Sequence, residues 1–194
     1  MNKNVKVTAE RHVRTYTELW HTSFVLLELG KEDERGRHHK LMGSLVFTAF
    51  AFEAYLNHLG PSLFETWSHI ERLSPKAKFE VLAERVGLKA DFGCRPQQTI
   101  IRLFGFRNDI AHGKSITLKD MRIESLEVYQ KDPWSFRAQT DWEKYCTIEN
   151  TERAREDINS VVHTLHKASE IKDEYPFLHG FEIRGGELII DDNN

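Results

Sequence analysis

The apolar positions of the chain recur mainly at steps of three and four residues, which is typical of amphipathic helices. The first such pattern spans residues 10–29, and its apolar face is marked by Val13, Tyr16, Trp20, Phe24 and Leu27. Gly30 ends this pattern, and a charged, glycine-containing turn follows it. We therefore expect a first helix over residues 10–29 with that face buried.

A second helix, of about residues 40–59, is apolar on nearly all sides, as expected of a helix at the centre of a bundle. From Leu41 onward, Glu53 is its only formally charged residue. Glu53 shares a helix face with Ala49 and Leu56, where a carboxylate is costly unless a cation or several hydrogen-bond donors meet it. We therefore expect Glu53 to have a partner elsewhere in the fold.

Further helical segments follow at residues 63–70, 75–86 and 97–112. Ser74 and Pro75 provide an N-cap and a proline at the first helical position, and Gly87 ends the helix that they begin. Gly113 follows the last segment as a C-cap glycine. Residues 88–96, between these helices, are predicted to be a loop.

Residues 114–148 show no clear helical period. Their first part alternates weakly between apolar and polar residues, whereas the second part is polar, rich in aromatic residues and interrupted by proline. We interpret the stretch as a long insertion or loop that partly covers the helical bundle.

A last helix is predicted over about residues 150–171. Its buried face is marked by Ala154, Ile158, Val161, Val162, Leu165, Ala168 and Ile171. His163 and His166 project away from that face, so we interpret them as solvent-exposed surface and not as a metal site.

The C-terminal residues 172–194 are predicted to form a tail. The segment FEIRGGELIIDD within it is interpreted as two short strands around Gly185 and Gly186, a small hairpin. The predicted fold is an all-α bundle of about five helices over residues 1–171, with residues 114–148 as an insertion and a small C-terminal β-hairpin.

The composition agrees with one folded domain of ordinary type. Of 194 residues, 40% are hydrophobic and 29% are charged, which provides enough apolar material for a core. The 27 basic and 30 acidic residues give a net charge of −3, without a polybasic tail. Coating of nucleic acid by bulk charge is therefore not expected, and a polyanion would have to bind at a local site.

The sequence contains no hydrophobic run of transmembrane length, and its N-terminal segment lacks the apolar core of a signal peptide. Cys94 and Cys146 lie far apart and match no metal-binding or redox spacing. We expect a cytoplasmic protein with reduced thiols, no metal, no cofactor and no membrane partner.

Arg107, like Glu53, carries a charge that helix formation does not explain. Its neighbours three and four positions away are all apolar, namely Leu103, Phe104, Ile110 and Ala111. A guanidinium on such a stripe needs an anionic partner, which is either a carboxylate or a phosphate. Glu53 is the intramolecular candidate, and a ligand phosphate is the functional one.

His112 lies in the last turn of the same predicted helix, about 140° around an ideal helix from Arg107. The two side chains therefore converge only if the helix end bends or a second copy of the helix faces the first. Asn108 lies four residues before His112 and shares its face, so an amide–imidazole hydrogen bond is feasible. Asp109 adds a carboxylate close by.

The segments RNDIAHG (residues 107–113) and FEAYLN (residues 52–57) resemble the HEPN superfamily, named for its occurrence in higher eukaryotes and prokaryotes. In that signature an Arg, commonly followed by a polar residue, lies four to six positions before a His near a helix end. Here four residues separate Arg107 from His112, and the polar residue is Asn108. Helix order and length are similar over roughly residues 10–170.

The resemblance implies an all-α bundle that pairs into a homodimer, with the two motif helices meeting across a cleft. Catalytic members of the superfamily are metal-independent endoribonucleases. Many are toxins or antiviral-defence effectors, often found beside a nucleotidyltransferase-type antitoxin. The implied function is therefore RNA cleavage by attack of the ribose 2′-OH, which leaves a 2′,3′-cyclic phosphate and a 5′-hydroxyl.

The resemblance also implies residue roles. His112 would act as general base or acid on the 2′-OH or on the leaving 5′-oxygen. Arg107 would stabilise the charge that develops on the scissile phosphate. Asn108 would orient His112 or the phosphate. Each role has a structural alternative: Arg107 can form a buried salt bridge with Glu53, and His112 can bond a carbonyl at the helix end.

The residues around the motif are given supporting roles. Glu53 and Asp109 are expected to act structurally or to support the motif, and Lys114 is a candidate RNA contact or a solvated lysine. Four aromatic residues of the insertion could stack RNA bases; they are Trp134, Phe136, Trp142 and Tyr145. We favour the interpretation that they anchor the insertion to its own domain.

A second class of function remains open, in which a homodimer of the same fold binds RNA, a nucleotide or a partner protein without cleaving it. The mildly acidic composition favours this alternative, because a polynucleotide enzyme usually has a more basic surface. The intact Arg–polar–His motif favours the enzyme. A purely structural helical dimer is the third possibility.

Overall fold

The computed structural model describes residues 4–134, 137–171 and 175–189. The longer helices are α1 (Thr15–Glu32), α2 (Arg37–Leu63), α4 (Pro75–Arg85), α5 (Gln98–His112) and α8 (Ile148–Ala168). The short ones are α3 (Trp67–Ile70), α6 (Leu126–Lys131) and α7 (Asp141–Tyr145). The strands β1 (Asn4–Arg11) and β2 (Glu182–Ile189) form a two-stranded antiparallel sheet. A mostly helical fold with a small β element is thus confirmed.

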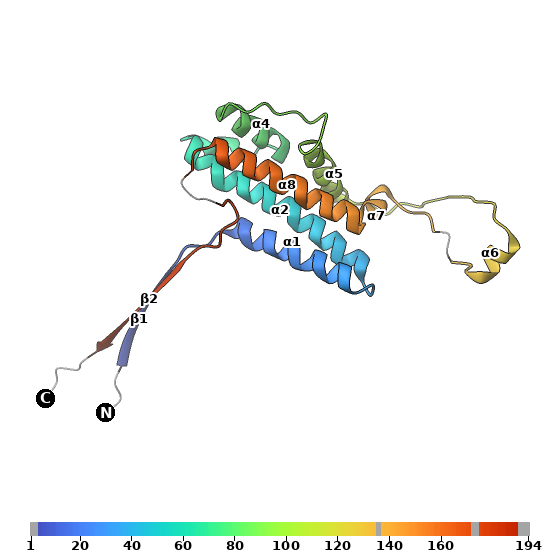
Figure 1. The fold of residues 1–194 in the computed structure, drawn as a ribbon, viewed down its shortest axis with the longest axis horizontal. Helices are drawn as coiled ribbons and strands as arrows, with labels where there is room; N and C mark the ends of the chain where they lie inside the picture. The colour runs from blue at the N-terminus through green and yellow to red at the C-terminus, as the bar shows by residue number, and fades with distance from the viewer. Residues whose placement is uncertain (1–3, 135–136, 172–174, 190–194) are drawn as a thin grey trace.

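Helix α2 is the central element, and α1, α4, α5 and α8 all pack against it (Figure 1). Its largely apolar circumference explains this position, because four other helices pack against it. Leu45, Phe52 and Leu56 of α2 are fully buried, and so are Ile158 and Val162 of α8. Each buried side chain of this size stabilises the fold by about 1.5–3 kcal/mol. The core therefore lies where the sequence pattern predicts it.

The first helix begins five residues later than expected, because residues 10 and 11 belong to β1. Tyr16 and Leu27 are buried as predicted. Val13 and Phe24 are 54% and 45% exposed, so that part of the predicted face is wrong. Val13 lies outside α1, which begins at Thr15, and Phe24 lies on a side of α1 that the bundle covers only partly.

Two helix boundaries show how local signals act. The Ser74 hydroxyl accepts a hydrogen bond from the Ala77 N–H, as an N-cap does, and Gly87 has a φ of +75° just beyond α4. Gly113 follows α5 as predicted, but its φ is −55°. Glycine is needed there for space, because a Cβ would lie 2.7 Å from the carbonyl oxygen of Asp109.

The predicted C-terminal hairpin is wrong. Residues 182–189 form one continuous strand that pairs with β1, so that Gly185 lies opposite Thr8 and Gly186 opposite Val7. The two strands project from the bundle as a ribbon whose residues are all exposed (Figure 1). Residues 4–11 alternate between apolar and polar side chains, as a strand does. Their pairing with β2 joins segments far apart in the chain, whereas Gly185 and Gly186 indicated a local turn.

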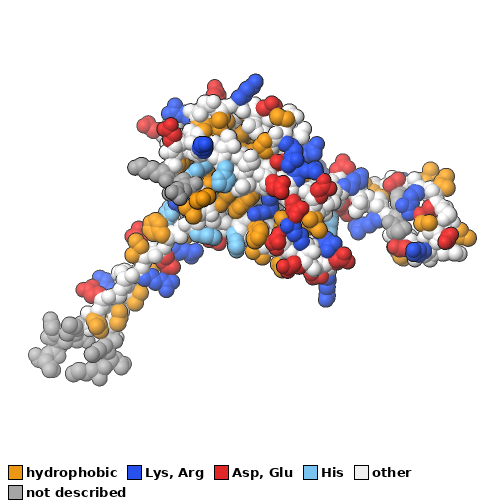
Figure 2. Space-filling view, in the orientation of Figure 1, with side chains coloured by type: hydrophobic (Ala, Val, Ile, Leu, Met, Phe, Trp, Pro, Cys, Tyr) orange, Lys and Arg blue, Asp and Glu red, His pale blue; other side chains and the backbone are white. Residues whose placement is uncertain are grey.

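The predicted insertion has two parts that behave differently. Residues 114–134 extend away from the bundle as an arm that carries α6, and apolar side chains lie exposed at its free end (Figures 1 and 2). Met121, Ile123 and Trp134 are 89%, 96% and 89% exposed. The expectation that this part covers the bundle is therefore wrong, because its apolar residues are separated by charged ones and form no continuous face.

The second part of the insertion does pack on the bundle. Trp142 and Tyr145 of α7 lie against the core, so they anchor the chain as we expected. Trp134 lies on the arm and anchors nothing, and Phe136 lies outside the described residues.

The interpretation of His166 as surface is also wrong. Its side chain is buried, and its Nδ1 lies 3.0 Å from the Tyr55 hydroxyl in a hydrogen bond. His166 lies four residues after Val162 and therefore on the same side of α8. The buried arc of this helix is wider than the stripe of aliphatic residues, because Tyr55 of α2 offers a polar partner at its edge.

Within the described residues, no helix combines the length and the apolar character that crossing a membrane requires.

Candidate functional site

Glu53 has two cationic partners from two different helices. Its Oε2 accepts a hydrogen bond from Arg107 Nη2 of α5 at 3.1 Å, and its Oε1 accepts one from Lys78 Nζ of α4 at 3.2 Å. Lys78 Nζ also donates to Asn57 Oδ1 at 2.9 Å. The expected Glu53–Arg107 ion pair is thus present. The three charged residues tie α2, α4 and α5 together.

Lys78 is a charged neighbour of the site that was not predicted from the sequence. Its side chain is only 2% exposed, although it carries a charge. The signal that identified Arg107 was available here too, because Lys78 precedes Phe79 and lies four residues before Leu82, both of which are buried. A lysine on an apolar stripe requires an anionic or polar partner, and Glu53 is that partner.

The Arg107 guanidinium is held on several sides. Nη1 donates to Asn108 Oδ1 at 3.0 Å, and the ring of Phe50 lies 5.7 Å from Cζ. Among the described residues, the buried Nε has no hydrogen-bond partner. The side chain is 25% exposed, which places it at the edge of the buried stripe. Lys78, Glu53 and Arg107 together carry a net charge of +1, so the cluster retains a positive charge that an external anion can use.

His112 is exposed in the last turn of α5 and lines a cleft of about 630 Å³. Asn108, Asp109 and Lys114 line the same cleft. Helix α5 runs without interruption to His112, so the expected angular separation from Arg107 is preserved. Arg107 is absent from the described lining of this cleft.

The site residues therefore fall into two groups on different faces of α5. Glu53 and Arg107 form the half-buried ion pair, whereas His112 and Lys114 lie in the cleft. Asn108 connects the groups, because it bonds Arg107 and also lines the cleft. In the part of the chain that the structure describes, no hydrogen bond joins Asn108 to His112, so that feasible bond is not formed.

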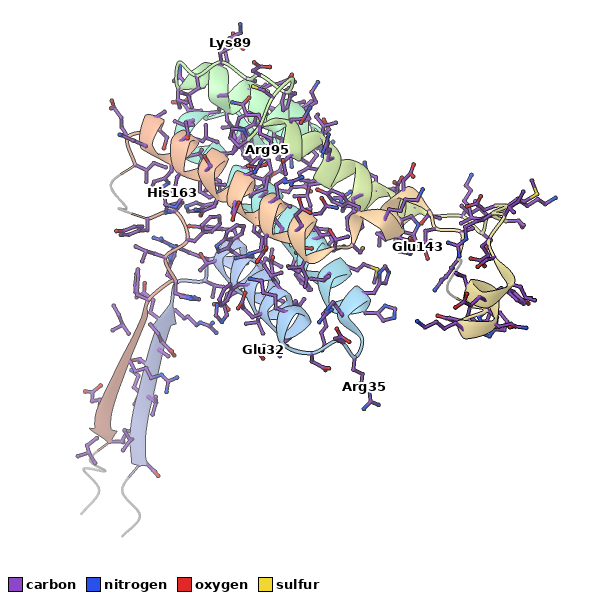
Figure 3. All side chains as sticks on the ribbon, turned by 45° about the vertical axis from the view of Figure 1, so that its right-hand side comes forward. Glu32, Arg35, Lys89, Arg95, Glu143 and His163 are labelled. Atoms are coloured by element: carbon purple, nitrogen blue, oxygen red, sulfur yellow. The ribbon has the colours of Figure 1, made fainter. Side chains whose placement is uncertain are left out.

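A second cleft, of about 450 Å³, lies between α5 and α7. It adjoins the first, since Asp109, Asp141 and Trp142 line both. Helix α7 is fixed at its start by a capping box, in which the Thr140 N–H donates to Glu143 Oε2 at 2.8 Å. This bond and that from the Thr140 hydroxyl lower the pKa of Glu143 below its usual value. Glu143 lies at the base of the arm (Figure 3).

The start of α5 is fixed independently. Arg95 Nε and Nη2 donate to the two carboxylate oxygens of Asp157 on α8, at 2.7 and 2.8 Å. The Thr99 hydroxyl donates to Asp157 Oδ2. Arg95 lies beside α8 in Figure 3. This bidentate pair is the strong type of charge-assisted contact and sets how α5 sits on α8.

No model of a known family, no curated sequence and no solved structure matches the chain. Among residues 4–134, 137–171 and 175–189, no group of three or more His, Cys, Asp or Glu side chains is arranged to hold a metal ion. The case for a function therefore rests on the α5 site itself.

Proposed function

We propose that the protein is a metal-independent endoribonuclease of the HEPN type, acting in the cytoplasm as a toxin or antiviral-defence effector. The observation that carries the proposal is the exposed imidazole of His112 in a cleft at the end of α5, with Lys114 beside it. A positively charged cluster around Arg107 lies on a different face of the same helix.

The proposed reaction needs one proton acceptor, one proton donor and a stabiliser of negative charge. His112 accepts the proton of the ribose 2′-OH as that oxygen attacks the phosphorus, and the bond from phosphorus to the 5′-oxygen breaks. The leaving 5′-oxygen takes up a proton from solvent water, so the products are a 2′,3′-cyclic phosphate and a 5′-hydroxyl. Arg107 stabilises the phosphate oxygens in the transition state, Asn108 orients the reacting groups and Lys114 contacts the RNA backbone.

The proposal includes a homodimer. Within one chain Arg107 and His112 lie about 140° apart around α5, and Arg107 does not line the cleft that contains His112. A second copy of α5 facing the first would bring an Arg from one chain to a His of the other. The proposed cellular partner is a nucleotidyltransferase-type antitoxin that blocks this cleft.

The same observation favours one alternative, a non-cleaving homodimer that binds RNA, a nucleotide or a partner protein. If the two motif groups stay apart in the assembled protein, Arg107 serves as a helix cross-link to Glu53. His112 and Lys114 then only bind a phosphate.

The decisive experiment is cleavage of RNA by the purified protein in the presence of a metal chelator. We expect a 2′,3′-cyclic phosphate product, and loss of at least about 100-fold in rate for His112→Ala, as for a removed general acid–base group. Arg107→Ala should lose a similar factor. His39→Ala, which removes an exposed imidazole on α2, is the matched control. If the wild type leaves a broad set of RNAs intact, or if the His112 variant cleaves normally, the enzyme proposal is wrong.

A further inference from the structure

Gly105 lies in the middle of α5, where glycine is unfavourable compared with alanine. Its position is exposed, and a Cβ added there would meet no atom within 4 Å. Packing inside this chain therefore gives no reason for a glycine at this point. The missing side chain does leave bare helix backbone on the surface, which allows a ligand to approach closely.

Gly105 forms part of the floor of the cleft between α5 and α7. Trp142 and Tyr145 of α7 form an aromatic wall on one side of it. The Tyr145 ring packs on Phe106 at 5.5 Å, so this wall is supported from the core. The cleft thus combines bare helix backbone at Gly105 with an aromatic side that packs on the core, and we call it the groove.

Trp142 is held in place while part of it stays available. Its helix is fixed by the capping box of Thr140 and Glu143, and the indole packs partly against the core. The ring of His38 lies 6.0 Å from the indole and is tilted by 47°, so His38 does not stack on it. Trp142 lines both clefts and therefore lies at the boundary between the groove and the His112 cleft.

Charged side chains of both signs line the two clefts. In the groove, Arg102 and Lys144 are balanced by Asp109 and Asp141. A neutral, planar group with polar edges suits such surroundings better than a phosphate does. The same two aspartates line the adjoining cleft, where a phosphate would bind through Lys114 and His112.

We propose that the groove between α5 and α7 binds a nucleobase of single-stranded RNA, which lies over the bare backbone at Gly105 and stacks on Trp142. Gly105 precedes His112 by two turns, about 10 Å along the helix axis. The groove therefore lies beside the phosphate position at His112 and holds a nucleotide that adjoins the scissile one. This inference rests on the proposed function and specifies that its RNA substrate is single-stranded.

The test is binding of a 2′-O-methyl RNA oligonucleotide, which is not cleavable, measured by anisotropy and by quenching of tryptophan fluorescence. Gly105→Ala should raise the melting temperature by about 2 °C, because alanine favours the helix. The same substitution should weaken oligonucleotide binding about tenfold, because its methyl group enters the groove. A variant that is more stable yet binds worse has not simply misfolded.

Ser160→Ala is the matched control, because it improves helix propensity on the exposed side of α8 and lines neither cleft. It should leave binding unchanged. Trp142→Ala should weaken binding about tenfold, whereas Trp142→Phe should keep most of the affinity and lose the fluorescence signal. Unchanged binding in the Gly105 and Trp142 variants would overturn the inference.

Further outcomes distinguish this inference from dimerisation at the groove and from the endoribonuclease proposal. A change of sedimentation in Gly105→Ala, with RNA binding intact, would mean that a second copy of α5 occupies the groove, and the inference would be wrong. If the wild type binds the 2′-O-methyl oligonucleotide through Gly105 and Trp142 but cleaves no RNA, the groove stands and the endoribonuclease proposal fails. If RNA is cleaved and cleavage is insensitive to both groove variants, the endoribonuclease proposal stands and the groove inference fails.

Discussion

Glu53 and Lys78 form an ion pair at 3.2 Å between α2 and α4, although the lysine side chain is only 2% exposed. The other oxygen of the same carboxylate binds Arg107, so the buried lysine and the arginine of the candidate site share one carboxylate. A lone Glu53–Arg107 pair would be neutral, whereas the three residues together carry a net charge of +1. Lys78 thus keeps the site attractive to an anion.

Lys78→Met should lower the free energy of unfolding by about 2–3 kcal/mol, because it removes one partner of a buried pair and leaves Asn57 and Glu53 short of a donor. Lys78→Met combined with Glu53→Gln should recover part of this loss, since the Glu53 oxygen that loses the ammonium donor then no longer belongs to a charged group. Urea denaturation measures both. Lys76→Met, which breaks an exposed pair with Glu80, should change stability by less than about 0.5 kcal/mol.

The same variants test the role of charge at the site. In Lys78→Met the Glu53–Arg107 pair is neutral, so affinity for the 2′-O-methyl oligonucleotide should fall. In the double variant Arg107 carries the whole charge again, and affinity should return toward the wild-type value. If affinity follows stability and not net charge across the series, the electrostatic account of Lys78 is wrong.

Asp157→Ala should destabilise the protein by about 2–3 kcal/mol, because Arg95 and Thr99 lose a buried acceptor that fixes the start of α5. Arg95 itself is half exposed, which keeps the expected loss below that of a fully buried pair. Arg153→Ala, which breaks a more exposed pair with Glu149 on α8, should cost less than about 0.5 kcal/mol. Equal effects of the two substitutions in thermal unfolding would contradict this account.

Stability should fall at alkaline pH. Burial raises the pKa of Tyr55 and Tyr145 above their usual value, and that of Cys146 to about 12. As the pH rises above the ordinary pKa values of about 9–10, the unfolded chain releases protons that the folded protein retains, so unfolding becomes more favourable. Urea midpoints measured from neutral pH to about pH 11 should decrease.

Substitutions identify the residues responsible. Tyr55→Phe and Cys146→Ala should each flatten the alkaline decrease, even if they also lower stability at neutral pH. Tyr129→Phe removes a phenol that is 53% exposed on α6 and should leave the slope unchanged. A slope that responds only to Tyr129 would refute the assignment.

The ribbon should contribute little to the stability of the bundle, because every residue of β1 and β2 is exposed. Gly185→Val would place its Cβ about 2.9 Å from Thr8 Oγ1 and should loosen the pairing. We expect faster amide hydrogen exchange along residues 4–11, with a change in global unfolding free energy below about 0.5 kcal/mol. Unchanged exchange in β1 would argue that β2 is not its partner.

Features that depend on neighbouring residues in the chain could be predicted from the sequence. The N-cap at Ser74, the glycine after α4 and the aliphatic stripe of α8 follow from hydrogen bonds and side-chain spacing within one helix. The separation of Arg107 and His112 belongs to this class as well, because helix geometry alone sets the angle between them. The need of Glu53 for a cation also followed from local reasoning.

Contacts between distant segments could not be derived in this way. The sequence of residues 182–189 does not specify which segment pairs with it, and only the folded chain brings β1 alongside. Tyr55 forms a hydrogen bond with His166, and Lys78 an ion pair with Glu53, because whole helices pack on α2. The residue pattern of a single helix does not specify that packing. Local sequence thus determines where helices begin, end and carry apolar faces, since those energies arise within a few residues. Which polar groups meet, and which clefts open beside α5, depends on how helices pack, since those energies arise only when segments far apart in the chain come together.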